Sequence, residues 1–155
     1  MHYQRILCPI DFSDCSQVAA RYAVDLARSA GAEIVLVHAL DVVALTPETS
    51  RPPDRGLVEK LDAVLADVTD VTVSRFFHPG PPVEVICWAA QDRGCDLIVI
   101  GTHGRTGLKH LLMGSVAEHV LRHAPVPILV VRDRPADERP LVEPSVDPVL
   151  APRYE

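Results

Sequence analysis

The sequence predicts a single-domain α/β protein with three layers, in which a parallel sheet is covered by helices on both faces. Three observations support this prediction. Short apolar runs alternate with segments of helical periodicity, as in chains built from strand–helix–strand units. The apolar runs are nearly continuous, as expected of strands buried on both faces. The length of 155 residues is enough for one domain with a sizeable core.

The first half of the chain is expected to supply two strands and two helices. Residues 5–10 are apolar and form the first strand, and Ser13 follows at the position of a helix N-cap. Apolar residues then recur at helical spacing until Gly31 ends the helix. Residues 33–39 form the second strand, and the segment 46–55, rich in Pro, Ser and Thr, is a loop. The face of a short second helix consists of Leu57, Leu61, Val64, Leu65 and Val68.

Prolines and glycines divide the second half into clear elements. Pro81 and Pro82 occupy positions that tolerate proline at a helix start, and Gly94 ends that helix. Pro125 and Pro127 break the last helix. The expected strands are residues 71–77, 96–100 and 128–131, and the last helix is residues 115–123.

The chain is expected to have a boundary near residue 132. The domain covers residues 1–132, and residues 133–155 contain five prolines among mixed charges and few large apolar residues. Such a composition predicts an extended or disordered tail. A partner-binding motif in this tail is the alternative.

Composition excludes several classes of function. The net charge of −6 argues against a nucleic-acid binder, which needs a basic face. No apolar stretch approaches the length of a membrane span, and the first residues lack the pattern of a signal peptide, so we expect a cytoplasmic protein. The four cysteines lack metal-ligand spacing and are expected to be free thiols, with Cys8 and Cys87 in the core.

The most informative segment is GTHGRTGLKHLLMGS at residues 101–115, which directly follows the apolar run 97–100. Glycines let the backbone approach a ligand closely, and the first amides of the next helix attract anions. Arg105 and Lys109 add positive charge. The segment therefore predicts a phosphate site. It is not a Walker A loop, because Gly107 is followed by Leu108 instead of Lys.

Two residues permit both a structural and a functional interpretation. Asp11, after the first strand, would bind a ribose hydroxyl or a metal ion, or would cap the next helix beside Ser13. Ser115 and Glu118 have the spacing of a capping box, while the Ser115 hydroxyl could equally meet a phosphate. The residue types alone leave Asp11 undecided.

These motifs together resemble a known family. The pattern G-x2-G-x9-G-S at residues 101–115 resembles the signature of the universal stress proteins. The segment RILCPIDFSDCS at residues 5–16 is similar to the first strand of that family and its Asp. Residues 80–82 with Ile86 are similar to the start of its third helix. The resemblance covers residues 3–132 and leaves the tail outside.

The resemblance implies the Rossmann-like sheet order 3-2-1-4-5, the ATP-binding branch of the family, and a homodimer. Asp11 would bind the ribose of ATP, which is held with or without Mg²⁺, and no catalytic or metal-ligating residue is implied. The edge strand from Val126 to Val131 would pair with a second copy, as its apolar character also suggests. The residues implied to contact the nucleotide are Pro9, Ile10, Asp11, Ala39, Ile100, Gly101, Gly104, Arg105, Gly114, Ser115 and Val116.

We therefore expect an ATP-binding regulatory protein of the stress response that acts through an unknown protein partner and is not a dedicated enzyme. Two other classes stay open. One is a slow ATPase or nucleotidyl-transferase-like enzyme, which would need a positioned water and charge stabilisation in addition to a phosphate cradle. The other is an interaction module that needs no nucleotide.

Overall fold

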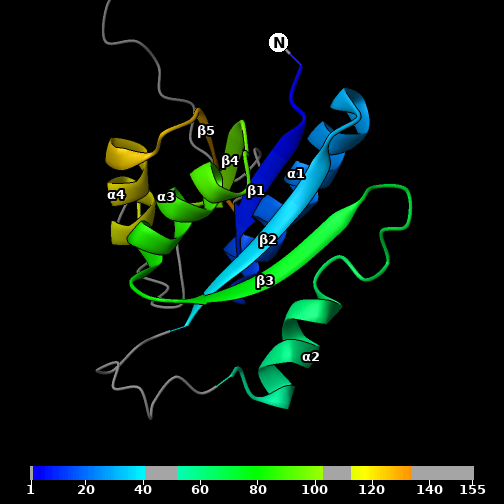
Figure 1. The fold of residues 1–155 in the computed structure, drawn as a ribbon. Helices are drawn as coiled ribbons and strands as arrows, with labels where there is room; N and C mark the ends of the chain where they lie inside the picture. The colour runs from blue at the N-terminus through cyan, green and yellow to red at the C-terminus, as the bar shows by residue number, and fades with distance from the viewer. Residues whose placement is uncertain (1, 41–51, 103–112, 134–155) are drawn as a thin grey trace, which may run out of the picture.

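Five parallel strands form one sheet in the order β3-β2-β1-β4-β5, as the family resemblance implied (Figure 1). The computed structural model describes residues 2–40, 52–102 and 113–133. The strands are β1 Arg5–Pro9, β2 Glu33–Leu40, β3 Val73–Pro79, β4 Leu97–Gly101 and β5 Ile128–Val131. The helices are α1 Asp14–Ala30, α2 Arg55–Ala63, α3 Pro82–Asp92 and α4 Ser115–His123. The predicted α/β class with its parallel sheet is confirmed.

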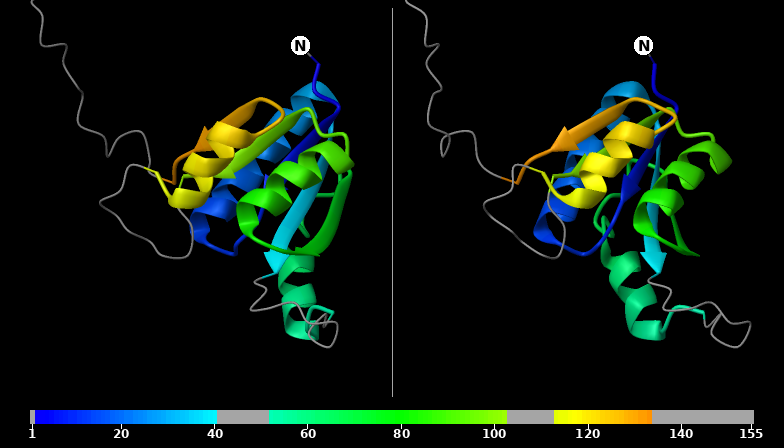
Figure 2. Two further views of the ribbon diagram at one scale, coloured as in Figure 1. Left: turned by 60° about the vertical axis from the view of Figure 1, so that its left-hand side comes forward. Right: turned by 90° about the vertical axis from the view of Figure 1, so that its left-hand side faces the viewer.

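The sheet is covered on both faces, which gives three layers (Figure 2). On one face, α1 packs with Leu61 and Leu65 against alternate residues of the strands, including Ile6 and Ile34. On the other face, α3 and α4 cover the strand residues that alternate with these, including Leu7. Because successive side chains of a strand point to opposite faces, the continuous apolar runs serve both layers.

The helix boundaries follow local chemistry. The Ser13 hydroxyl accepts a hydrogen bond from the Ser16 amide at 3.2 Å and caps α1, as predicted. Gly31 takes the left-handed conformation that ends α1, with φ of 68°. Pro81 is the N-cap residue of α3, as the paired prolines suggested.

The second helix is shorter than the sequence pattern suggested. It ends at Ala63, and Leu65 takes a left-handed conformation with φ of 58°, so Leu65 and Val68 lie beyond the helix. Both still pack against the core, which is why their spacing resembled a helical face. In the sheet, β3 begins at Val73 and continues through Pro79, slightly later than expected.

All four cysteines are free thiols, as expected. Cys8 is fully buried, and this burial raises the pKa of its thiol to about 12. Cys87 is only partly buried, contrary to its expected core position. Across the three described stretches, no helix has the length and apolar character needed to cross a membrane.

Candidate functional site

The carboxyl ends of β1, β2 and β4 lie at one edge of the sheet, because the strands are parallel. The strand order reverses between β1 and β4, since the chain first moves outward to β3 and later continues on the other side through β5. In open parallel sheets, this reversal leaves a crevice that binds ligands. A cavity of about 380 Å³ lies at this position, which is within the size range of small-molecule sites.

The cavity brings together most of the residues that the sequence pointed to. Nine of the eleven line it: Pro9, Ile10, Asp11, Ala39, Ile100, Gly101, Gly114, Ser115 and Val116. The other two, Gly104 and Arg105, lie outside the described residues, as do Lys109 and most of the glycine-rich segment. The sequence thus located the cavity from both of its sides, the β1 end and the start of α4.

One part of the cavity wall is apolar. Val37 on β2 and Ile100 on β4 come from the buried strands, and Ile86 comes from α3. Each of these three side chains is at most 5% exposed. A flat, weakly polar group such as a nucleobase would find apolar contacts here.

The turn between β1 and α1 carries Asp11. Its Oδ1 accepts hydrogen bonds from the Ser13 amide at 3.0 Å and from the Ser13 hydroxyl. Ser13 in turn caps α1 through its hydroxyl. Asp11 therefore lines the cavity and also supports the start of the helix through Ser13.

Gly101 is required by the packing of the protein itself. A Cβ atom at this position would lie 2.8 Å from the Sγ atom and 2.9 Å from the carbonyl oxygen of Cys15, in the first turn of α1. Such distances are not tolerated, and one of them is to rigid backbone. The absence of a side chain at Gly101 therefore lets α1 pack closely beside the cavity.

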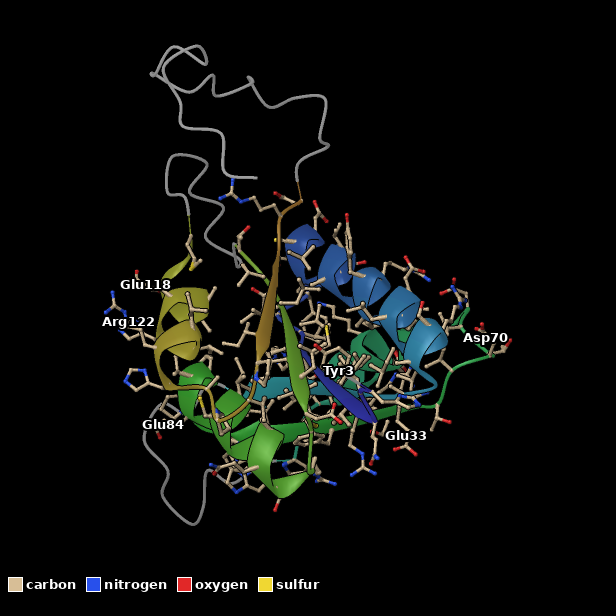
Figure 3. All side chains as sticks on the ribbon, turned by 90° about the horizontal axis from the view of Figure 1, so that it is seen from above. Tyr3, Glu33, Asp70, Glu84, Glu118 and Arg122 are labelled. Atoms are coloured by element: carbon tan, nitrogen blue, oxygen red, sulfur yellow. The ribbon has the colours of Figure 1, made fainter. Side chains whose placement is uncertain are left out.

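The start of α4 differs from the expected capping box. Gly114, and not Ser115, is the N-cap residue, and no side chain among the described residues caps the helix. Glu118, the expected second member of the box, instead accepts a hydrogen bond from Arg122 at 2.9 Å (Figure 3). Ser115 is the first helical residue and its side chain is exposed, so the capping interpretation is wrong.

This arrangement leaves the helix start suited to an anion. The first amides of a helix have no partner within the helix and carry partial positive charge. Gly114, Ser115, Val116 and Ala117 line the cavity. The Gly114 amide donates to the Thr102 carbonyl at 2.6 Å, which fixes the start of α4 beside the end of β4.

The sequence analysis did not select several other residues of the cavity wall. His38 and Thr102 are both nearly buried polar residues at strand ends, 5% and 2% exposed. The sequence signal that could have identified them is a polar residue within an apolar strand (His38) or directly after one (Thr102). The remaining wall residues outside the expected set are Ser16, Val37, Pro82, Ile86 and Ala117.

The described residues of the cavity do not form a metal site. Within the described parts of the chain, no group of three or more His, Cys, Asp or Glu side chains is placed to hold a metal ion. Asp11 is the one acidic residue among the described residues that line the cavity.

Sequence comparisons relate this chain to one protein family. The model of the universal stress protein family matches residues 2–132. Universal stress protein MJ0531 of Methanocaldococcus jannaschii is 36% identical over 140 residues, which cover 84% of this chain and 82% of that protein.

Solved structures show the same fold. The structure of protein MJ0577, also from Methanocaldococcus jannaschii, superposes with a TM-score of 0.70 at 30% identity and covers 88% of this chain and all of that one. Universal stress protein UspA from Lactobacillus plantarum gives a TM-score of 0.67 at 29% identity, over 85% of this chain and 99% of that one.

Proposed function

Because the chain belongs to the universal stress protein family, we propose that it is an ATP-binding regulatory protein of the stress response that acts as a homodimer in the cytoplasm. A protein partner would bind differently to the nucleotide-bound and nucleotide-free forms. No catalytic turnover is assigned to the chain.

The observation that carries this proposal is the cavity at the strand-order reversal. It combines an apolar wall, formed in part by Val37, Ile86 and Ile100, with a helix start that no described side chain caps. A nucleotide has the matching halves, a flat base and an anionic phosphate chain. The helix amides offer donors to the phosphate oxygens.

We propose an orientation for the nucleotide from the residues at the two ends of the cavity. The base would lie near Pro9 and Ala39, and Asp11 would accept hydrogen bonds from the ribose hydroxyls. The phosphates would lie beside Gly114 and meet the α4 amides of Ser115 and Val116, with Ile10, Ile100 and Gly101 bordering the nucleotide. Gly104 and Arg105, outside the described residues, complete the proposed phosphate site.

A binding role is favoured over an enzymatic one by what hydrolysis requires. Phosphoryl transfer needs metal-binding carboxylates, a positioned water and cations that stabilise the transition state. The described part of the cavity supplies one carboxylate, Asp11, which also supports the α1 start. Sustained Mg²⁺-dependent turnover that Asp11→Ala abolishes would instead indicate an ATPase or nucleotidyl transferase.

The same comparisons and the sheet support the proposed domain division and dimer. The family model ends at residue 132, which supports a nucleotide-binding domain of residues 1–132 followed by a separate tail. The strand β5 lies at the edge of the sheet, and Leu129 on it is 37% exposed. An apolar edge strand favours pairing with a second copy.

The test is the thermal stability of the purified protein with ATP. A ligand at 100 times its dissociation constant adds about 2.7 kcal/mol to the free energy of unfolding, which raises Tm by roughly 5–10 °C in a domain of this size. The bulky substitution Gly114→Leu should remove this rise and leave the fold intact. Gly56→Leu, in the exposed first turn of α2, is the matched control and should keep it.

Two results would contradict the proposal. If millimolar ATP leaves Tm unchanged, the chain is a nucleotide-independent interaction module. If Gly114→Leu responds to ATP like the unmodified protein, the α4 start is not the phosphate site.

A further inference from the structure

The turn that carries Asp11 contains an unfavourable backbone conformation. Phe12, the next residue, has φ of 65°, in the left-handed region that bulky residues rarely adopt. Such a conformation is unfavourable for a bulky residue and persists only where surrounding contacts hold it. The contacts around Phe12 therefore show what fixes this turn.

His38 on β2 contacts the residue before Asp11 and the residue after it. Its Nδ1 lies 2.6 Å from the carbonyl oxygen of Ile10, and its ring centroid lies 4.6 Å from that of Phe12. A carbonyl oxygen can only accept, so Nδ1 carries the proton and donates it. The side chain thus holds both neighbours of Asp11.

His38 acts at the point where β1 leaves the sheet. The last paired residues of the two strands are Pro9 and Val37, and the Ile10 amide still donates to the Val37 carbonyl at 2.8 Å. With the His38 contact, both backbone groups of Ile10 are held by β2. Phe77 on β3 braces the imidazole from another side, with ring centroids 5.9 Å apart in an edge-to-face arrangement.

We propose that His38 is the positioning residue for Asp11, holding the turn so that the carboxylate meets the sugar hydroxyls of the bound nucleotide. This inference rests on the proposed nucleotide-binding function. The Ser13 amide and hydroxyl hold one carboxylate oxygen from the helix side, and His38 holds the backbone from the sheet side. A group fixed in advance loses little freedom on binding, so its hydrogen bonds contribute more to affinity.

The consequence is selectivity for the sugar. Hydrogen bonds to a charged group contribute about 1.5–3 kcal/mol, so the protein should bind ATP roughly tenfold or more tightly than 2′,3′-dideoxy-ATP, which lacks both hydroxyls. This preference for ATP should depend on His38, although His38 lies on β2 and is separated from Asp11 in the sequence by the whole of α1.

Calorimetric titration with these two nucleotides tests the inference. His38→Phe keeps an aromatic ring between Phe12 and Phe77 but removes the donor, and it should bring the preference close to one. The affinity for ATP should fall more than the affinity for dideoxy-ATP, because only ATP uses the Asp11 contact. His38→Asn retains a donor near Nδ1 and should restore part of the preference.

A second pair of variants separates positioning from general stability. Asp11→Asn should lose the preference by itself, and adding His38→Phe to it should cause no further loss, since both act on the same contact. Phe12→Gly adopts the left-handed conformation freely and removes the ring that His38 holds. It should weaken the preference even if His38→Phe fails to fold.

The outcomes distinguish this inference from the function beneath it. Failure of the unmodified protein to bind ATP overturns both. If it binds ATP but does not prefer it to dideoxy-ATP, or if His38→Phe or Phe12→Gly keeps the full preference, only the role of His38 is overturned.

Discussion

At the scale of single residues, α1 and α4, two of the helices that begin beside the cavity, differ in how their first amides are satisfied. The Ser13 hydroxyl caps α1, whereas α4 begins at Gly114 with no capping side chain among the described residues. A side-chain cap would compete with a ligand for the same amides. The uncapped α4 therefore leaves its donors to whatever anion enters the cavity.

The same substitution at the two helix starts should have different effects. Ser13→Ala removes the α1 cap and a donor to Asp11, and should lower the free energy of unfolding by about 1 kcal/mol or more. Ser115→Ala removes an exposed hydroxyl that caps nothing, and should change it by less than about 0.5 kcal/mol. Urea denaturation of both variants measures the difference. Equal losses would mean that Ser115 does cap α4.

Sequence reasoning selected most of the residues that line the cavity, but it misjudged the local role of some of them. Gly114 and Ser115 were both selected, but the capping box was assigned one residue too late, because glycine is itself an acceptable N-cap. His38 was overlooked as a site residue because it lies in a run that is otherwise apolar. Only the fold shows that its ring reaches the β1 turn.

At the scale of elements, Arg75 adds a polar attachment to the apolar packing of Leu61 that holds α2. Arg75 on β3 donates from Nη2 to the Val64 carbonyl at 2.6 Å and from Nε to the Leu61 carbonyl at 3.2 Å. These carbonyls lie at the C-terminal end of α2, where a cation is favourable. Beyond α2, Asp67 and Asp70 pair with Arg21 and Arg28 of α1, which lowers the pKa of both carboxyls.

Replacing this arginine should loosen the helix. Arg75→Lys keeps the charge but cannot donate to both carbonyls, and should lower the free energy of unfolding by about 1 kcal/mol. Amide hydrogen exchange should accelerate in α2 more than in α1. Arg55→Lys is the matched control. Arg55 and its partner Glu59 are both exposed, so this change should have little effect on the free energy of unfolding. Unchanged exchange in α2 would show that Arg75 does not hold it.

The elements themselves were largely predictable, for identifiable reasons. The last helix and the last strand were placed at their observed bounds, because Pro125 and Pro127 separate them. The end of α2 was misplaced, since Leu65 and Val68 keep an apolar spacing while the backbone has already left the helix. Apolar spacing reports burial, and it indicates a helix only where the backbone stays regular.

At the scale of the whole molecule, buried thiols should make stability fall in alkali. Burial raises the pKa of Cys8 from 9.0 to about 12 and that of Cys95 to about 11. Below pH 9 the thiols are protonated in both states and have no effect. Above it the unfolded chain releases their protons and the folded protein does not, so the free energy of unfolding falls as pH rises toward 12.

The slope of that fall can be measured. Each such thiol contributes at most about 1.4 kcal/mol per pH unit. Urea denaturation between pH 8 and pH 11 should show a shallower decline for Cys8→Ala than for the unmodified protein, even though the variant is less stable overall. Parallel declines would show that Cys8 ionises equally in both states.

The proposed dimer gives a prediction for the assembled molecule. Leu129→Lys places a charge on the exposed edge strand β5 and should convert a particle of twice the 16.9 kDa chain mass into a monomer in light-scattering measurements. Tyr22→Lys changes an apolar residue on α1 that is 53% exposed, and should leave the dimer intact. A Leu129→Lys protein that stays dimeric would place the interface elsewhere.

The central place of β1 in the sheet has a consequence for how the chain acquires its fold. Its partner β4 lies about 90 residues away, as the pairing of Ile6 with Leu97 and the bond from the Gln4 amide to Asp96 show. Contacts between such distant segments form slowly, because a long loop must close first. During synthesis, one side of β1 stays open until β4 has left the ribosome, and that interval is when the nascent chain is most exposed to mispairing.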